Sequence, residues 1–273
     1  MKAKFILMGL LAIICGMASA DPVHSENLKP YLFESFNGAV QKCDLTGANN
    51  CIQIDGIYGL TKIATDGQYL YAGIYSGGIL KCDATGTNNC SLIDDVQEPV
   101  MGLASDGKYL YAGTHQGSVL KCDPTGANNC TQIDTLSGVQ SMSADSQNLY
   151  VGSGGIVLKC SLNGANNCVK IDDFHTRGGA TSMSSDGQYL YLGIGNGTIQ
   201  RCAPTGTDNC TQIDDFHTRG GATSMASDGQ YLYLSIEPPN APVAYYSVQR
   251  CDPRGVNNCA PVGQLGAADM LAA

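Results

Sequence analysis

The cysteines are the residues of this sequence whose type and spacing most clearly indicate chemistry. Of thirteen cysteines, all but Cys15 fall into pairs that enclose seven residues each. Regularly spaced thiolates could bind zinc or could join as disulfides. The gap is wider than the roughly two to four residues of common zinc motifs, and no histidine accompanies the pairs, so disulfides are favoured. The pairs are Cys43/Cys51, Cys82/Cys90, Cys122/Cys130, Cys160/Cys168, Cys202/Cys210 and Cys251/Cys259.

The phrase DDFHTRGGA occurs twice and sets a histidine close to an arginine each time. The first copy contains His175 and Arg177, and the second contains His217 and Arg219. Because arginine offers a rigid fork of hydrogen-bond donors, each copy could hold an anionic or polyhydroxyl ligand. The identity continues into the following TSM and SDGQYLYL segments. A recent duplication therefore explains the two copies equally well.

Paired aspartates could bind calcium, but their surroundings argue otherwise. Calcium takes about 6 to 8 oxygen ligands, and the sequence contains no compact Asp-x-Asp-x-Asp-Gly loop. Solvated charge or a capping turn is the alternative, and no cofactor or metal is predicted. The pairs lie at 94/95, 172/173 and 214/215.

Catalytic motifs are missing, and no catalytic residue is predicted. The sequence has no Gly-x-Ser-x-Gly, no His-Glu-x-x-His and no phosphate-binding glycine loop. A metal-assisted hydrolase could still assemble around a central channel. The candidate lining residues are Lys62, Ser141, Ser182, Ser224 and Asp269.

Residues 1–20 have the pattern of a secretory signal, with lysines, an apolar run and a final Ala-Ser-Ala. A lipidated Cys15 is the alternative. Removing the segment changes the formal charge from -9 to -11, because Lys2 and Lys4 leave with it. An acidic surface argues against nucleic acid as a partner. No later segment is apolar enough to span a bilayer, so a periplasmic or secreted location is predicted.

The rest of the chain is one repeated unit. The cysteine pairs recur at intervals of 38 to 49 residues, out of register with a second phrase such as SDGKYLYAG at 105–113. Within 98–135, VMGLAS, KYLYAG, SVLKC and NCTQID read as four short strands separated by turn residues, so that each cysteine of the pair lies in a strand. Four antiparallel strands in about 40 residues form one blade of a β-propeller.

The two ends of the chain predict a closed ring. Residues 30–43 match the second and third strands of a repeat, and 263–273 resemble a first strand. We therefore predict an all-β, six-bladed β-propeller with four antiparallel strands per blade, in which the C-terminal strand closes the first blade. Residues 21–273 would form this single domain. The predicted repeats are 27–57, 58–97, 98–137, 138–175, 176–217 and 218–262, with a closing strand at 263–273.

The phrase SDGQYLYLG, followed by a glycine-containing turn and another strand, resembles the blades of YVTN and lactonase-type β-propellers. This resemblance implies a propeller fold and raises lactonase-like hydrolysis as a possible activity. The disulfide-bearing repeats also resemble tectonin-like and tachylectin-like propellers, a resemblance that implies sugar binding. No functional residue of these families has a counterpart here. The tyrosines of the YLY phrase could stack on sugars or pack between neighbouring sheets, and alternation within a strand favours packing.

Propeller geometry places the constant turns on one face and the variable loops on the other. We call the latter, made of the blade links and the turns between second and third strands, the variable face. It carries Tyr58, Tyr75 and His115 together with both HTR copies, and variable loops on a rigid scaffold are the usual place for binding. The sequence favours a module that binds carbohydrate or protein. A hydrolase and a structural envelope protein remain alternatives, and the oligomeric state is undetermined.

Overall fold

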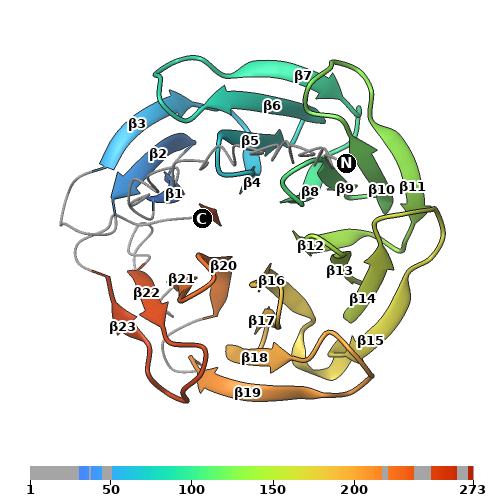
Figure 1. Ribbon diagram of the computed structural model, residues 1–273, viewed down its shortest axis with the longest axis vertical. Helices are drawn as coiled ribbons and strands as arrows, with labels where there is room; N and C mark the ends of the chain where they lie inside the picture. Colours follow the sequence, from blue (N-terminus) through green and yellow to red (C-terminus); the bar gives the residue numbers. More distant parts are fainter. Residues whose placement is uncertain are drawn as a thin grey trace, which may run out of the picture.

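Six four-stranded antiparallel sheets surround a central axis, with their innermost strands toward the centre and their outermost strands at the rim (Figure 1). We describe the protein from a computed structural model, which describes residues 31–36, 38–44, 51–216, 221–236, 247–262 and 270–272. The prediction of an all-β, six-bladed propeller is confirmed. The predicted leader at 1–20 lies outside the described residues, so it stays a prediction.

Each blade runs from an inner first strand to an outer fourth strand. Blade 1 contains β24 (Met270–Ala272), β1 (Tyr31–Phe36), β2 (Ala39–Asp44) and β3 (Cys51–Gly56). Blade 2 contains β4 (Leu60–Thr65), β5 (Tyr69–Ile74), β6 (Gly78–Asp83) and β7 (Ser91–Asp95). Blade 3 contains β8 (Val100–Ser105), β9 (Leu110–Thr114), β10 (Ser118–Cys122) and β11 (Thr131–Thr135).

The remaining blades repeat this order. Blade 4 contains β12 (Val139–Ala144), β13 (Asn148–Ser153), β14 (Ile156–Ser161) and β15 (Val169–Asp173). Blade 5 contains β16 (Ala180–Ser185), β17 (Leu190–Ile194), β18 (Thr198–Cys202) and β19 (Cys210–Asp215). Blade 6 contains β20 (Ala222–Ser227), β21 (Leu232–Ile236), β22 (Ser247–Cys251) and β23 (Ala260–Pro261).

The ring closes where the two ends of the chain meet. β24 pairs antiparallel with β1, with Ser35 opposite Met270 and Glu34 opposite Leu271. β24 also contacts β20 of blade 6 and β4 of blade 2. The prediction that the first blade takes its inner strand from the C-terminus is therefore confirmed.

The hydrophobic core lies between the blades, because alternate residues of each strand point to opposite sides of the sheet. In blade 2, Leu70 and Cys82 pack against blade 1. Tyr71 and Ile79, on the other side of the same sheet, pack against blade 3. The middle strand β9 is therefore buried on both faces, whereas the fourth strands β7 and β11 expose their first two residues and their last one at the rim.

The second tyrosine of the YLY phrase is a buried anchor for the preceding turn. Tyr111 is completely buried, and its hydroxyl donates a hydrogen bond to Asp106 at 2.9 Å. The other carboxylate oxygen of Asp106 accepts the backbone N–H of Tyr109 at 2.6 Å. Burial, followed by the bond to Asp106, raises the pKa of the Tyr111 hydroxyl. The same tyrosine–aspartate bond occurs in blades 2, 4, 5 and 6.

The first tyrosine of the phrase is covered by a cation from the third strand. The Lys81 ammonium lies 3.7 Å from the centroid of the Tyr69 ring and donates to the carbonyl of Pro124 in blade 3 at 3.0 Å. Lys121 and Arg201 make the same pair of contacts in blades 3 and 5. The packing interpretation of the YLY phrase is confirmed, because these tyrosines hold the architecture together.

Every predicted cysteine pair is a disulfide, one in each blade, so the prediction of the pairing is confirmed. The bonds are Cys43–Cys51, Cys82–Cys90, Cys122–Cys130, Cys160–Cys168, Cys202–Cys210 and Cys251–Cys259. The first cysteine of each pair is buried in the third strand, whereas the second is half-buried.

The position of the second cysteine differs from the prediction, which placed it inside the fourth strand. Cys51 and Cys210 are the first residues of β3 and β19. In the other blades the strand begins one residue later, so the prediction is wrong for Cys90, Cys130, Cys168 and Cys259. In blades 2 and 3 the reason is visible, because the N–H of this cysteine donates to an aspartate of the preceding blade.

The cysteine hairpin therefore also binds the preceding blade, which was not expected. In blade 3, Asn128 has a φ of 50° and donates its N–H to Ile93 of blade 2 at 2.8 Å. Asp94 of blade 2 accepts the N–H of Cys130 at 2.9 Å. Asn tolerates this left-handed conformation better than most residues, which explains its place in the repeat.

Candidate binding face and central channel

Two large side chains protrude from the variable face at blade 2. Tyr58 lies in the link between β3 and β4 and is 100% exposed, and Tyr75 lies in the turn between β5 and β6 and is 67% exposed. The N–H of Tyr75 donates to the carbonyl of Gly59 at 2.7 Å, so the two loops lie side by side. The other large exposed hydrophobic residues of the described chain lie on outer strands, on β1 or in a cysteine hairpin.

His115 extends this surface into blade 3. Its side chain is exposed in the turn between β9 and β10. Its N–H donates to the carbonyl of Pro99, in the link between blades 2 and 3, at 2.9 Å. The variable face therefore presents two tyrosines and a histidine over two neighbouring blades, on backbone held by hydrogen bonds.

The HTR segment of blade 4 forms the short 3₁₀ helix η1 (His175–Arg177). The imidazole Nδ1 of His175 lies 2.8 Å from a carboxylate oxygen of Asp173. The side-chain bond to His175 is the main cause that lowers the pKa of Asp173 to about 2. Arg177 lies over the buried ring of Phe174, with 4.8 Å between the guanidinium carbon and the ring centroid.

Each of these two side chains thus has a partner within its own turn, and their predicted role in ligand binding stays a prediction. The equivalent His217 and Arg219 lie outside the described residues.

The aspartate pairs predicted as possible calcium ligands serve as backbone acceptors where the structure describes their bonds. Asp94 binds the N–H of Cys130, as described above, and Asp95 accepts the N–H of Gln97 at 3.0 Å. Asp172 accepts the N–H of Asp173 at 2.7 Å. The bonds of Asp95 and Asp172 are local turn bonds, the alternative that the sequence left open, whereas the bond of Asp94 joins two blades.

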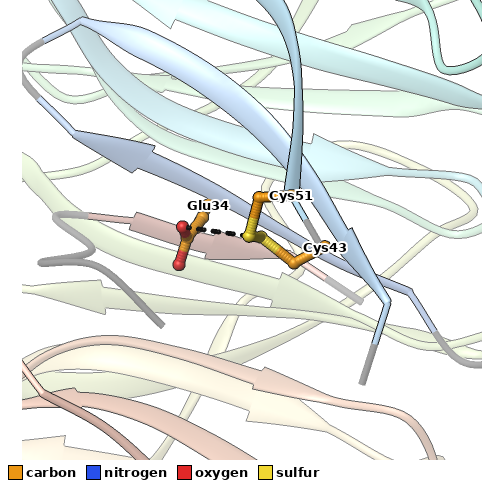
Figure 2. A group of neighbouring side chains, drawn as sticks. All are labelled: Glu34, Cys43 and Cys51. Carbon is orange, nitrogen blue, oxygen red and sulfur yellow. Dashed lines mark hydrogen bonds between the residues drawn. A yellow bond between two sulfur atoms is a disulfide. The ribbon is translucent and has the colours of Figure 1, made fainter. Parts of the chain in front are cut away.

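Glu34 is a buried carboxyl group next to a disulfide. It is 3% exposed, and one of its oxygens lies 3.7 Å from the sulfur of Cys51, while the other has no hydrogen-bond partner among the described residues (Figure 2). A disulfide sulfur carries no proton, so only a protonated Glu34 could donate across this contact. Burial raises the pKa of Glu34 to about 7.

Two groups of side chains resemble metal sites by proximity alone. Glu34 lies near Cys43 and Cys51, and Asp172 lies near Cys202 and Cys210. In both groups the two sulfurs are joined to each other. Because metals are bound by thiolates, only one carboxylate in each group remains a potential ligand. Neither donor set fits a metal site.

The described residues line two hollows along the axis of the central channel. The first, of about 130 Å³, is lined by the ends of the first strands near the Asp-Gly turns, including Ser105, Ser185 and Ser227. The second, of about 50 Å³, lies nearer the variable face and is lined by Lys62, Ser141, Ser182 and Ser224 among others. The structure therefore brings together four of the residues predicted to line the channel, and the fifth, Asp269, lies outside the described residues.

Lys62 and Glu34 both stand out when the repeats are aligned by their strands, although neither was singled out from the sequence as a departure from the repeat. The positions equivalent to Lys62 hold Gly102, Ser141, Ser182 and Ser224. Those equivalent to Glu34 hold Ala72, Ala112, Val151, Leu192 and Leu234. A charged residue at a position otherwise small or apolar is the signal that could have found them.

Solved structures show that the fold is widespread. A chain in the crystal structure of a nidogen–laminin complex has 13% identity and a TM-score of 0.74, over 89% of this chain and 97% of that one. The WD40 repeats of RRP9 have 14% identity and a TM-score of 0.64, over 89% of this chain and 80% of that one. No protein-family model and no curated protein matches the sequence. At these identities the likeness defines the class of the fold, a β-propeller, and no more.

No helix in the described part of the chain is long and apolar enough to cross a membrane.

Proposed function

We propose that the protein is an exported binding module that recognises another protein through the variable face of blades 2 and 3. The observation that carries this proposal is the pair of exposed tyrosines, Tyr58 and Tyr75, on adjacent loops held by the bond between Tyr75 and Gly59. Tyrosine supplies a large contact area at a small cost in conformational entropy and is enriched in binding hot spots.

Three further observations support the proposal. Six disulfides are typical of proteins that work in an oxidising compartment. One of the similar propellers comes from a structure of a protein–protein complex, that of nidogen and laminin. An acidic protein with a formal charge of -9 also disfavours nucleic acid as the partner.

The alternatives have weaker support. The YLY tyrosines and Tyr31 are buried or covered by cations, so Tyr58 and Tyr75 are the tyrosines of the described residues that remain for stacking on a sugar. The described residues that line the channel hollows include one ionisable side chain, Lys62, and no acid or histidine for general acid–base chemistry. Neither arrangement favours a lectin or a hydrolase over a protein-binding module.

Site-specific photo-crosslinking tests the proposal. A crosslinking amino acid at position 58 should capture a partner from the extracellular or periplasmic fraction. The same amino acid at position 92 should not, because Leu92 is 57% exposed but lies on the outer strand β7 of the same blade. Tyr58→Ser combined with Tyr75→Ser should then weaken the affinity for the captured protein by about 30-fold or more.

Leu92→Ser is the matched control and should leave the affinity within about twofold. Equal losses in both variants would reject the variable face as the site. Binding to a glycan array that disappears in the tyrosine variant, without any captured protein, would assign the same surface to carbohydrate.

A further inference from the structure

Lys62 is a cation inside the channel without a charged partner among the described residues. Its side chain enters the hollow of about 50 Å³ from β4, and no other described residue lining that hollow is ionisable. Lys62 has no hydrogen bond or ion pair within the described part of the chain, whereas most other described lysines and arginines do. Burial alone lowers the pKa of its ammonium group, with no contribution from a neighbouring charge.

The small residues around Lys62 cannot serve as its counter-charge. Ser141 donates its hydroxyl proton to the carbonyl of Ala180 at 2.8 Å, and Ser182 donates to that of Ala222 at 3.0 Å. In the neighbouring blade the equivalent residue is Gly102, whose missing side chain leaves room for the packed Met142. The described lining of the hollow therefore consists of hydroxyl-bearing and apolar side chains around one ammonium group.

An unpaired ammonium group in a confined space is unfavourable, and an anion that binds there relieves the cost. The hollow of about 50 Å³ exceeds the roughly 10 to 15 Å³ that one water needs, so it has room for a group as small as a carboxylate. Lys62 would donate a charge-assisted hydrogen bond to it.

We propose that the hollow at Lys62 binds a carboxylate group that enters the channel from the variable face. The carboxylate comes either from a free small acid or from the tip of an acidic side chain. This site is separate from the tyrosines of blade 2, so it does not rest on the proposed function.

Nuclear magnetic resonance of protein labelled at lysine Cε carbons tests this proposal directly. Titration with sodium acetate should shift the Lys62 signal in a saturable way and raise its apparent pKa, because the bound carboxylate favours the charged form. Acetamide and matched sodium chloride should not do so. The Lys81 signal is the internal control, because that ammonium already binds Pro124 and Tyr69 at the rim.

Three variants complete the test. Lys62→Met should abolish the acetate-dependent rise in melting temperature, whereas Lys81→Met should keep it. Tyr58→Ser with Tyr75→Ser should also keep it, which separates this proposal from the proposed function. N-acetylglutamate amide in place of acetate distinguishes the two sources, since its binding shows that an acidic side chain can reach Lys62, whereas binding of acetate alone assigns the site to free acids.

A wild-type protein whose Lys62 signal does not respond to acetate or to N-acetylglutamate amide would overturn the proposal. If Asp269→Asn then gained the response, the C-terminal segment would itself supply the carboxylate, and no external anion site would exist.

Discussion

At the scale of single residues, the departures from the repeat are more informative than the repeat itself. Glu34 replaces an apolar residue on the side of β1 that faces blade 6. Leu32, two residues earlier on the same side, packs against Tyr233 and Val248 of that blade. A carboxyl group thus lies between blade 6 and blade 1, the blade that the two ends of the chain build together.

The stability of the protein should fall as Glu34 loses its proton. Its pKa is about 7 in the folded protein against a usual value of 4.5, because burial disfavours the charged form. The folded state therefore holds the proton more tightly than the unfolded state. The contribution of protonated Glu34 to the free energy of unfolding is complete below pH 4.5. It is lost as the pH rises to about 7, which lowers the free energy of unfolding by roughly 3 kcal/mol.

Urea unfolding between pH 5 and 8 measures this effect. Glu34→Ala, which restores the residue type of blades 2 and 3, should remove the loss and be more stable than the wild type at pH 8. Asp83→Asn is the control. The bonds to Thr85 lower the pKa of Asp83 below its usual 3.8, so its contribution to stability is lost only under that pH, and the variant should keep the wild-type pH dependence between pH 5 and 8. A wild type and a Glu34→Ala variant with parallel pH profiles would refute the buried-carboxyl interpretation.

At the scale of elements, the cysteine hairpin has two roles of which the sequence reveals only one. The spacing of the cysteines predicted a local bridge, because its two ends lie on neighbouring segments of one hairpin. The bonds from Asn128 to Ile93 and from Cys130 to Asp94 join residues about 35 positions apart. Such contacts depend on how one blade docks on the next, which no local pattern encodes. For the same reason the aligned repeats indicate the core but not the hollow around Lys62.

Asp94→Ala should destabilise the protein by about 1 to 3 kcal/mol, because the N–H of Cys130 loses its hydrogen-bond acceptor, the buried carboxylate of Asp94. Asp95→Ala is the matched control, since its exposed carboxylate bonds only within its own turn and should cost less than about 0.5 kcal/mol. Both are measured by urea unfolding.

The disulfide and the inter-blade bond should also be coupled. When Cys122 and Cys130 are both changed to Ala, the hairpin can move away from blade 2 and the cost of Asp94→Ala should shrink by half or more. Strict additivity of the two changes would show that the bridge and the bond to blade 2 act independently.

At the scale of the whole molecule, the ring depends on a strand that comes from the far end of the chain. In every blade except the first, the inner strand directly precedes the second strand. Only the assembly of blade 1 brings together the two ends of the chain and so carries the loop-closure entropy of nearly the entire sequence. The order of the repeats was enough to predict this closure, because a partial repeat at the start matched a lone strand at the end. The identity of the ligand could not be predicted, because the loops of the variable face differ from blade to blade.

Removal of 263–273 should leave β1 as an open edge strand and uncover the seam lined by Leu32 and Tyr233. Open edges pair with other chains, so the truncated protein should aggregate or melt at a lower temperature, as measured by light scattering and calorimetry. A circular permutant that places 263–272 directly before residue 31 is the matched control. It supplies the same strand in the order of the other blades and should regain a monomeric, heat-stable ring. A truncated protein that is as soluble, monomeric and heat-stable as the full chain would show that β24 is dispensable for closure.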